Sequence, residues 1–229
     1  MKLFWRIPLA VVLVTGASLS LQASALLNGS FESQTVPASP GYTVLAVGAL
    51  VGLDNWSIVG PGSGNVAVIS GTFAPAGYAL AAEDANQWVD LTGSTSFVAQ
   101  GVEQTVATTI GTQYTLSFWV GNVSDAAHGL GTTSTVDVLL GGIGGSSLGA
   151  FTNSNATPSA MNWQQFTTTF TATGSSTTLD FLNGDGIGDD LNGLDNVVLT
   201  ATGTPEPATL WLLGGGMIGL GFLRRRKAV

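Results

Sequence analysis

The chain has 229 residues, a formal net charge of −8 and no cysteine. All six lysines and arginines lie near its two ends, and thirteen of the 14 acidic residues lie between Leu26 and Thr204. This acidic segment has no basic side chain except His128, which argues against nucleic-acid partners, because phosphates are bound by cations that displace counterions. The lack of cysteine excludes disulfides and thiolate chemistry.

The first 25 residues have the composition of a cleavable export signal. Lys2 and Arg6 precede an apolar run at residues 7–21, and Ala23 and Ala25 form an A-x-A cleavage site. We therefore expect a signal helix that is removed after Ala25. The alternative is an uncleaved anchor helix, which the short apolar run disfavours.

The central segment consists of short runs in which apolar and polar residues alternate, as is typical of β-strands. In residues 113–122, for example, every second residue from Tyr114 to Val120 is apolar. About nine such runs, separated by Gly, Pro, Asn and Ser clusters, predict an all-β domain, a single antiparallel β-sandwich of the jelly-roll type over residues 26–200. The other runs are residues 56–59, 66–69, 88–91, 101–106, 135–140, 165–172, 177–182 and 194–200, and residues 141–149 are expected to form a loop or hairpin.

A second apolar stretch follows a linker at residues 201–204. Pro205, Glu206 and Pro207 precede apolar residues 208–223, and the basic cluster Arg224, Arg225, Arg226 and Lys227 comes next. At about 1.5 Å per residue this stretch covers about 24 Å, less than a ~30 Å hydrocarbon core, and bilayer thinning or snorkelling arginines can close that gap. We expect a short transmembrane helix with its basic end in the cytoplasm.

The order Pro-Glu-Pro, short glycine-rich span and arginine cluster resembles the PEP-CTERM sorting signal of Gram-negative bacteria, here residues 205–229. The resemblance implies that an exosortase-type membrane protease cleaves near Pro205, Glu206 and Pro207. The protein would then be held transiently in the inner membrane and finally reach the cell surface or the extracellular space. The alternative is a permanent single-span membrane anchor.

The ectodomain is similar to the DUF642 and choice-of-anchor extracellular domains, which share a galactose-binding-like jelly roll with several carbohydrate-binding modules. Plant DUF642 proteins carry tandem domains with cysteines and associate with cell-wall polysaccharide, whereas this chain has one such domain and no cysteine. The motifs that carry the resemblance are NGSFE at 28–32, NWS at 55–57, VAVI at 66–69, WVDL at 88–91, VEQT at 102–105, GTQYTLSF at 111–118 and GLDNV at 193–197.

This second resemblance implies a structural Ca²⁺ ion between the opening and closing strands, with Glu32 and Asp195 as the matching carboxylates. Calcium suits such a place because it accepts six to eight oxygen ligands at flexible angles. The alternative is that both carboxylates only accept hydrogen bonds from turn amides. Acidic residues 183–190 do not have EF-hand spacing, so we expect a solvated glycine-rich turn there.

Trp119 is a candidate sugar-binding platform, because its parity places it opposite the apolar face of residues 113–122. The alternative is that it covers the second face of the sheet under a loop. His128, the single histidine, lies in a pentapeptide (124–128) that is too local for a catalytic triad. The sequence therefore predicts a non-enzymatic surface protein that associates with extracellular polysaccharide; the alternative is a structural or adhesion protein that binds other proteins.

Overall fold

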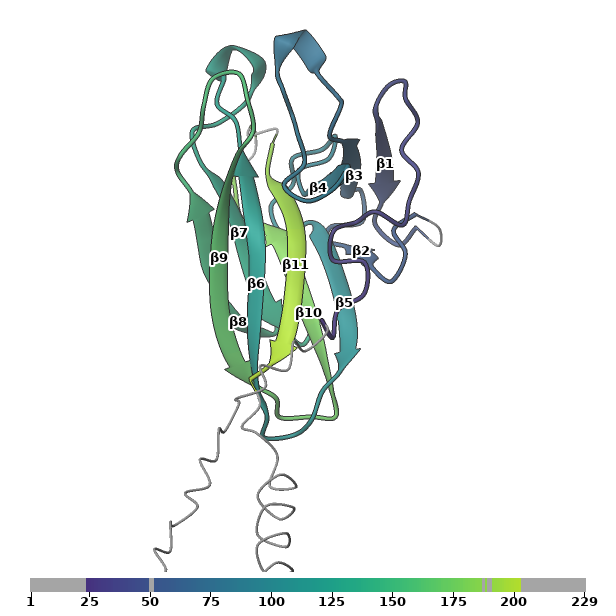
Figure 1. Cartoon of the computed structure of the whole chain (residues 1–229), viewed down its shortest axis with the longest axis vertical. Helices are drawn as coiled ribbons and strands as arrows, with labels where there is room; N and C mark the ends of the chain where they lie inside the picture. The colour runs from purple at the N-terminus through teal and green to yellow at the C-terminus, as the bar shows by residue number, and fades with distance from the viewer. Residues whose placement is uncertain (1–23, 50–51, 187, 189–190, 203–229) are drawn as a thin grey trace, which may run out of the picture.

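The described residues of the computed structural model, 24–49, 52–186, 188 and 191–202, form two antiparallel β-sheets (Figure 1). The strand order is β1-β3-β4-β11-β6-β9 in the six-stranded sheet and β2-β5-β10-β7-β8 in the five-stranded sheet. The elements are β1 (Tyr42–Ala46), β2 (Ser57–Val59), β3 (Asn65–Ser70), the 3₁₀ turn η1 (Pro75–Gly77), β4 (Gln87–Asp90), β5 (Gly101–Ala107), β6 (Gln113–Asn122), the 3₁₀ turn η2 (Ala126–His128), β7 (Ser134–Leu140), β8 (Ser146–Asn153), β9 (Asn162–Thr171), β10 (Ser176–Asn183) and β11 (Gly193–Ala201).

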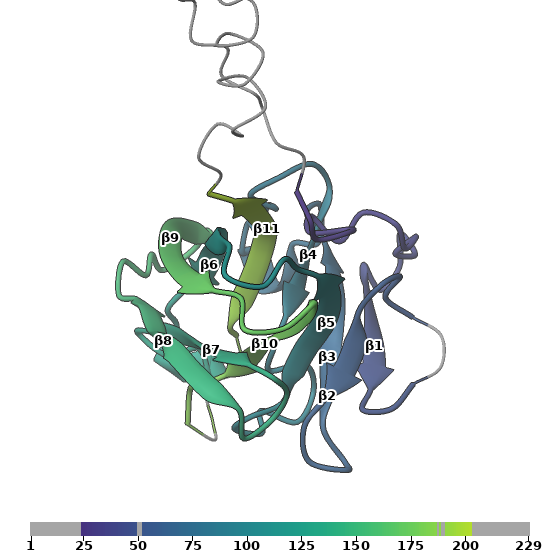
Figure 2. The same cartoon turned by 90° about the horizontal axis from the view of Figure 1, so that it is seen from below.

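The predicted all-β sandwich is confirmed for these residues, and Figure 2 shows the two sheets as facing layers. Two strands were not predicted, β1 and β8, and each is the last strand at one edge of its sheet. Edge strands bury few side chains: Leu45 is the one buried residue of β1, and Asn153 that of β8. In the sequences of these two strands, YTVLA and SSLGAFTN, apolar and polar residues do not alternate, unlike in the strands that were identified.

The predicted signal helix and transmembrane helix fall on residues 1–23 and 208–223, which lie outside the described residues. Within the described part of the chain, no helix is long and apolar enough to cross a membrane.

The main core lies between the two sheets and is built by the inward residues of the alternating strands. Phe118 of β6 is fully buried, and its ring centroid lies 5.1 Å from that of Phe151 and 5.4 Å from that of Phe181. Trp56 continues this aromatic core, with its ring 5.9 Å from that of Phe181. Aromatic pairs at these distances join the two sheets across the sandwich.

A second apolar cluster covers the outer face of the six-stranded sheet at one end. In β3, Val66 and Val68 belong to the main core, whereas Ala67 and Ile69 pack on the opposite face. The strand is therefore buried on both faces, and the outer one is covered by the long β3–β4 and β6–β7 connections (Figure 1). These connections lie at the end of the sandwich opposite the C-terminal end of β11.

Asp180 of β10 faces away from the main core and is nevertheless fully buried. It is the cross-strand partner of Glu103 on β5, and its Oδ2 accepts a hydrogen bond from the Gly142 amide at 3.0 Å. Burial first, and the neighbouring Glu103 carboxyl second, raise the pKa of Asp180 to about 6.

We expect Asp180 to make stability fall as the pH rises. Its folded-state pKa of about 6 lies above the unfolded value of about 4, so the folded state binds more protons between the two. This contribution to the unfolding free energy is fully present below about pH 4 and is lost as the pH rises through about 6. Urea titrations at acidic and neutral pH should therefore show a smaller difference for Asp180→Asn than for the wild type. Asp54→Asn, at an exposed carboxyl, is the matched control. An equal pH dependence in the wild type and Asp180→Asn would contradict the assignment.

Candidate functional site

The two connections over the outer sheet face enclose a cavity of about 250 Å³. Most of its lining is apolar and comes from β3, β4 and both connections, while three ionisable residues, Tyr78, Asp90 and His128, also border it. The lining residues are Ile69, Phe73, Pro75, Tyr78, Leu80, Trp88, Asp90, His128, Leu130 and Leu191. We refer to this cavity as the outer-face pocket.

The β3–β4 connection is held on the sheet by its own short turn and by tryptophan. Pro75 begins η1, and the Tyr78 amide donates to the Pro75 carbonyl. The Trp88 indole N–H donates to the Leu80 carbonyl at 3.0 Å, and the Trp88 ring packs edge-on against Trp163 at 5.9 Å. These contacts fix Tyr78 and Leu80 over the outer sheet face.

The β6–β7 connection turns back on itself at η2. The Asp125 side chain accepts from the Ala127 amide at 2.9 Å, and the Asp125 and Leu130 backbones exchange two hydrogen bonds of 3.0 Å. Gly129 allows this reversal because its φ of 77° lies in the left-handed region, which glycine adopts without a side-chain clash. The reversal brings His128 to the mouth of the outer-face pocket.

Tyr78, Asp125 and His128 form a hydrogen-bonded cluster at this mouth. The Tyr78 hydroxyl donates to Asp125 Oδ2, and His128 Nδ1 lies 2.8 Å from the same oxygen and 3.1 Å from the tyrosine oxygen. The tyrosine hydrogen bond, followed by that of His128, lowers the pKa of Asp125 to about 2, while the bond to Asp125 raises the pKa of Tyr78.

The protonation pattern of this cluster follows from the ionised carboxylate. An ionised carboxylate only accepts hydrogen bonds, so His128 carries its proton on Nδ1 and leaves Nε2 to take up or release another. Asp125 would then stabilise the imidazolium that forms. The arrangement is suited to moving a proton at the edge of an apolar pocket.

Asp90 lies at the inner side of the same pocket and has a structural task. Its Oδ1 accepts from the Thr92 amide at 3.0 Å, the Thr92 hydroxyl at 2.7 Å and the Asn192 amide at 3.1 Å. These bonds connect the end of β4 to the residue that precedes β11, and so hold the neighbouring Leu191 in the pocket wall.

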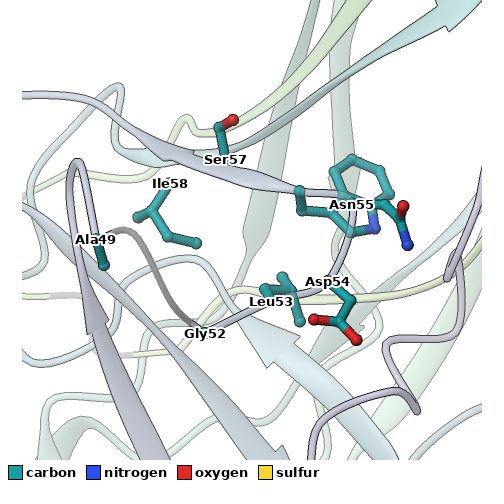
Figure 3. A pocket seen from close by; sticks show the side chains of 8 residues that line it. Ala49, Gly52, Leu53, Asp54, Asn55, Ser57 and Ile58 are labelled. Atoms are coloured by element: carbon teal, nitrogen blue, oxygen red, sulfur yellow. The ribbon is translucent and has the colours of Figure 1, made fainter.

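A larger cavity, of about 500 Å³, is lined by Ala49 and residues 52–58, among them Leu53 and Asp54 with its carboxylate (Figure 3). Trp56 also lines it, but its indole N–H donates to the Asn28 carbonyl. Among the described residues that line this cavity, Asp54 is the single ionisable one, so it lacks the coupled acid and base of the outer-face pocket.

Glu32 and Asp195, the expected calcium ligands, both hold the segment between η1 and β4. Glu32 Oε1 accepts from the Asn86 and Gln87 amides at 2.7 and 2.6 Å, and Asp195 Oδ2 accepts from the Glu83 and Asp84 amides at 2.9 and 3.0 Å. Their remaining oxygens also accept N–H groups, from the Asn86 side chain and the Asn196 amide respectively. Burial, as the largest cause, raises the pKa of Asp195 to about 7.

Both carboxylates thus make the contacts expected if they only accept hydrogen bonds from turn amides. A cation bound by them would have to displace the N–H groups that point at their oxygens. The described residues contain no group of three or more His, Cys, Asp or Glu side chains arranged to hold a metal ion. These contacts do not test the expected calcium site, so calcium binding by Glu32 and Asp195 stays a prediction.

The structure leaves the other predicted site residues untested. Trp119 is half-buried on the outer face of β6, where its cross-strand partners are Asp195 and Gln165. Ala25 is described, and its amide donates to the Leu199 carbonyl at 2.8 Å. Ala23 and the sorting residues Pro205, Glu206, Pro207, Arg224, Arg225 and Arg226 lie outside the described residues, so cleavage at either end stays a prediction.

A jelly roll with an apolar pocket and a hydrogen-bonded Tyr–Asp–His cluster at its mouth has the features of a ligand-binding or catalytic β-sandwich. Residues 22–192 match the family described as HpiC1 cyclase, and the chain therefore belongs to the HpiC1-like family. Residues 204–227 match the PEP-CTERM protein-sorting motif. This second match confirms the predicted sorting signal and indicates an exported protein. No curated protein matches the chain.

Three solved structures share the fold. A cyclase from Fischerella sp. TAU is 20% identical with a TM-score of 0.53, over 78% of this chain and 96% of that one. A Stig cyclase from the same source, in complex with (3Z)-3-(1-methyl-2-pyrrolidinylidene)-3H-indole, is 20% identical with a TM-score of 0.52, over 80% and 99%. An apo cyclase from Fischerella sp. is 20% identical with a TM-score of 0.51, over 81% and 98%.

The prediction of a non-enzymatic protein is wrong, because the family to which the chain belongs is one of cyclases. The pentapeptide at 124–128 contains Asp125 and His128 but not Tyr78, which lies 50 residues earlier in the chain than His128 and could not be predicted from that pattern. The one signal of this cluster in the sequence is that His128, the single histidine, follows Asp125 by three residues. The assignment to DUF642 is not confirmed.

We expect Tyr78→Phe to raise the pKa of Asp125, since the tyrosine hydrogen bond is the largest cause of its low value. His128→Ala should raise it less, because that bond ranks second. Carbon-detected NMR titration of the Asp125 carboxyl would measure both effects. An unchanged Asp125 titration in Tyr78→Phe would show that the hydroxyl does not hold the carboxylate.

Proposed function

We propose that this protein is an exported cyclase that acts on an apolar, ring-bearing small molecule in the outer-face pocket. The observation that carries the proposal is the Tyr78–Asp125–His128 cluster at the mouth of an apolar cavity, in a member of a cyclase family. The indole compound bound to the structurally similar Stig cyclase supports an aromatic ligand class.

The cluster supplies the chemistry that a proton-initiated cyclisation requires. His128, protonated on Nε2, donates a proton to an unsaturated carbon of the substrate, and the positive charge that develops is attacked by another unsaturated bond of the same molecule to close the ring. Loss of a proton to His128 Nε2 then restores the catalyst, so no proton is consumed overall. The ionised Asp125 stabilises both the imidazolium and the positive charge on the substrate.

The apolar walls of the pocket keep water away from the reacting groups. Leu80, Leu130 and Leu191 line the pocket with no hydrogen-bonding group in their side chains. They exclude water that would otherwise add to the charged intermediate before the ring closes.

Turnover by variants of the full chain tests this proposal. Cyclisation leaves the mass unchanged, so indoles with an alkenyl side chain are incubated with the protein and isomers are separated by liquid chromatography with mass detection. We expect His128→Ala and Tyr78→Phe to lower turnover about 10²- to 10⁴-fold, the usual contribution of general acid–base groups. Asp54→Asn, in the other cavity, should leave it unchanged. Equal turnover in His128→Ala and wild type, or no binding of any indole at the outer-face pocket, would overturn the proposal.

Association with extracellular polysaccharide is a second proposed property, and Trp119 is the observation in its favour. The indole is half-buried on the outer face of the six-stranded sheet, beside the polar Ser117 and Gln165, where it can stack on a pyranose ring. Trp119→Ala should reduce retention of the protein on immobilised polysaccharide, with Ser117→Ala as a control on the same strand. Equal retention of Trp119→Ala and wild type would refute the platform and favour protein partners.

Processing at both ends is likewise proposed, with an exosortase-type protease as the partner. Cleavage after Ala25 would free Leu26, a buried residue of the main core, as the new N-terminus. The intact mass of the protein from its native host would show whether the chain begins at Leu26 and ends near Pro205. A mass that retains residues 224–227 would indicate a permanent membrane anchor.

A further inference from the structure

The outer-face pocket lies in a domain with almost no positively charged side chain that could bind an anion. Between Leu26 and Thr204 the sequence has no lysine or arginine, and His128 is its one side chain that can become positive. A ligand carboxylate or phosphate buried here would lose its hydration without gaining a charged partner, which is costly.

The same pocket has two carboxyl side chains in or beside its lining. Asp90 borders its inner side, and Asp125 lies at its mouth, bonded to the lining residues Tyr78 and His128. The low pKa of Asp125, about 2, keeps it ionised at neutral pH. Asp125 Oδ2 already accepts from Tyr78 and His128, whereas its Oδ1 accepts only from the Ala127 amide and so keeps a lone pair for a further donor.

The pocket walls add aromatic surface to this negative charge. Phe73, Tyr78 and Trp88 line it, and Trp88 is held in place by its bond to Leu80 and by the edge-on Trp163 ring. Aromatic rings attract organic cations through the negative potential of their faces, and they pack well against planar ligands.

We propose that the outer-face pocket selects ligands in which a protonated amine is attached to a planar aromatic skeleton, and that it discriminates against carboxylates of the same size. The ammonium group is placed at the mouth beside Asp125, and the ring lies among the apolar and aromatic walls. This inference rests on the proposed function for the location of the pocket and adds the charge of its substrate.

Calorimetric titration of the full chain with three matched indoles tests this selectivity. Tryptamine, tryptophol and indole-3-propionate share one ring and a two-carbon arm, and they end in an ammonium, a hydroxyl and a carboxylate. We expect tryptamine to bind about tenfold more tightly than tryptophol, as one partly screened charge interaction would provide, and indole-3-propionate to bind most weakly. Raising the salt concentration from about 0.05 to about 0.5 M should weaken tryptamine binding selectively.

Two variants separate the possible outcomes. Asp125→Asn removes the charge with little change in shape and should bring the affinity for tryptamine down to that for tryptophol, whereas Asp54→Asn in the other cavity should change neither.

If all three indoles bind equally and salt has no selective effect, the charge inference fails while the proposed function stands. If none binds the wild type, both fail. If Asp54→Asn rather than Asp125→Asn weakens tryptamine binding, the ligand occupies the other cavity and the inference is wrong. The salt series on the wild type decides the matter even if Asp125→Asn does not fold.

Discussion

Strand β3 is buried on both of its faces, and the covering loops and the pocket beneath them follow from this burial. Val66 and Val68 complete the core between the sheets, so Ala67 and Ile69 are left on the outer face and need a cover of their own. The β3–β4 and β6–β7 connections supply it, since exposed apolar surface is costly in water. A cover made of loops fills the space less completely than a third sheet would, and the outer-face pocket is what remains beneath it.

Carboxylates fix these loops in a domain that lacks lysine and arginine. Glu32 and Asp195 accept amides of the segment between η1 and β4, Asp125 accepts the Ala127 amide within η2, and Asp185 accepts the Thr135 amide at 2.9 Å. Charge-assisted bonds to amides are stronger than neutral ones, so they replace the salt bridges that other surfaces use. Within the described residues His128 is the one side chain that can become positive, and it is bonded to Asp125 at the pocket. The acidic composition therefore serves both loop structure and the character of the site.

The β-sandwich could be predicted from the sequence, whereas the outer-face pocket could not. The reason is physical. The alternation from Tyr114 to Val120 reports which face is buried, because neighbouring strand residues point to opposite faces. No such local rule connects Tyr78 with His128, which meet only after two connections fold over the same sheet. Likewise, Glu32 and Asp195 could be matched as a pair through the resemblance, whereas their amide partners at residues 83–87 depend on the loop conformation.

The outer-face pocket is the proposed ligand site, and chemical-shift mapping by NMR can locate a bound ligand there. Titration of the ¹⁵N-labelled protein with tryptophol should shift the indole N–H signal of Trp88 and the amide signals of Leu130 and Leu191, and leave those of Asn55 and Ser57 unchanged. Shifts confined to Asn55 and Ser57 would place the ligand in the cavity of Figure 3 and contradict the account.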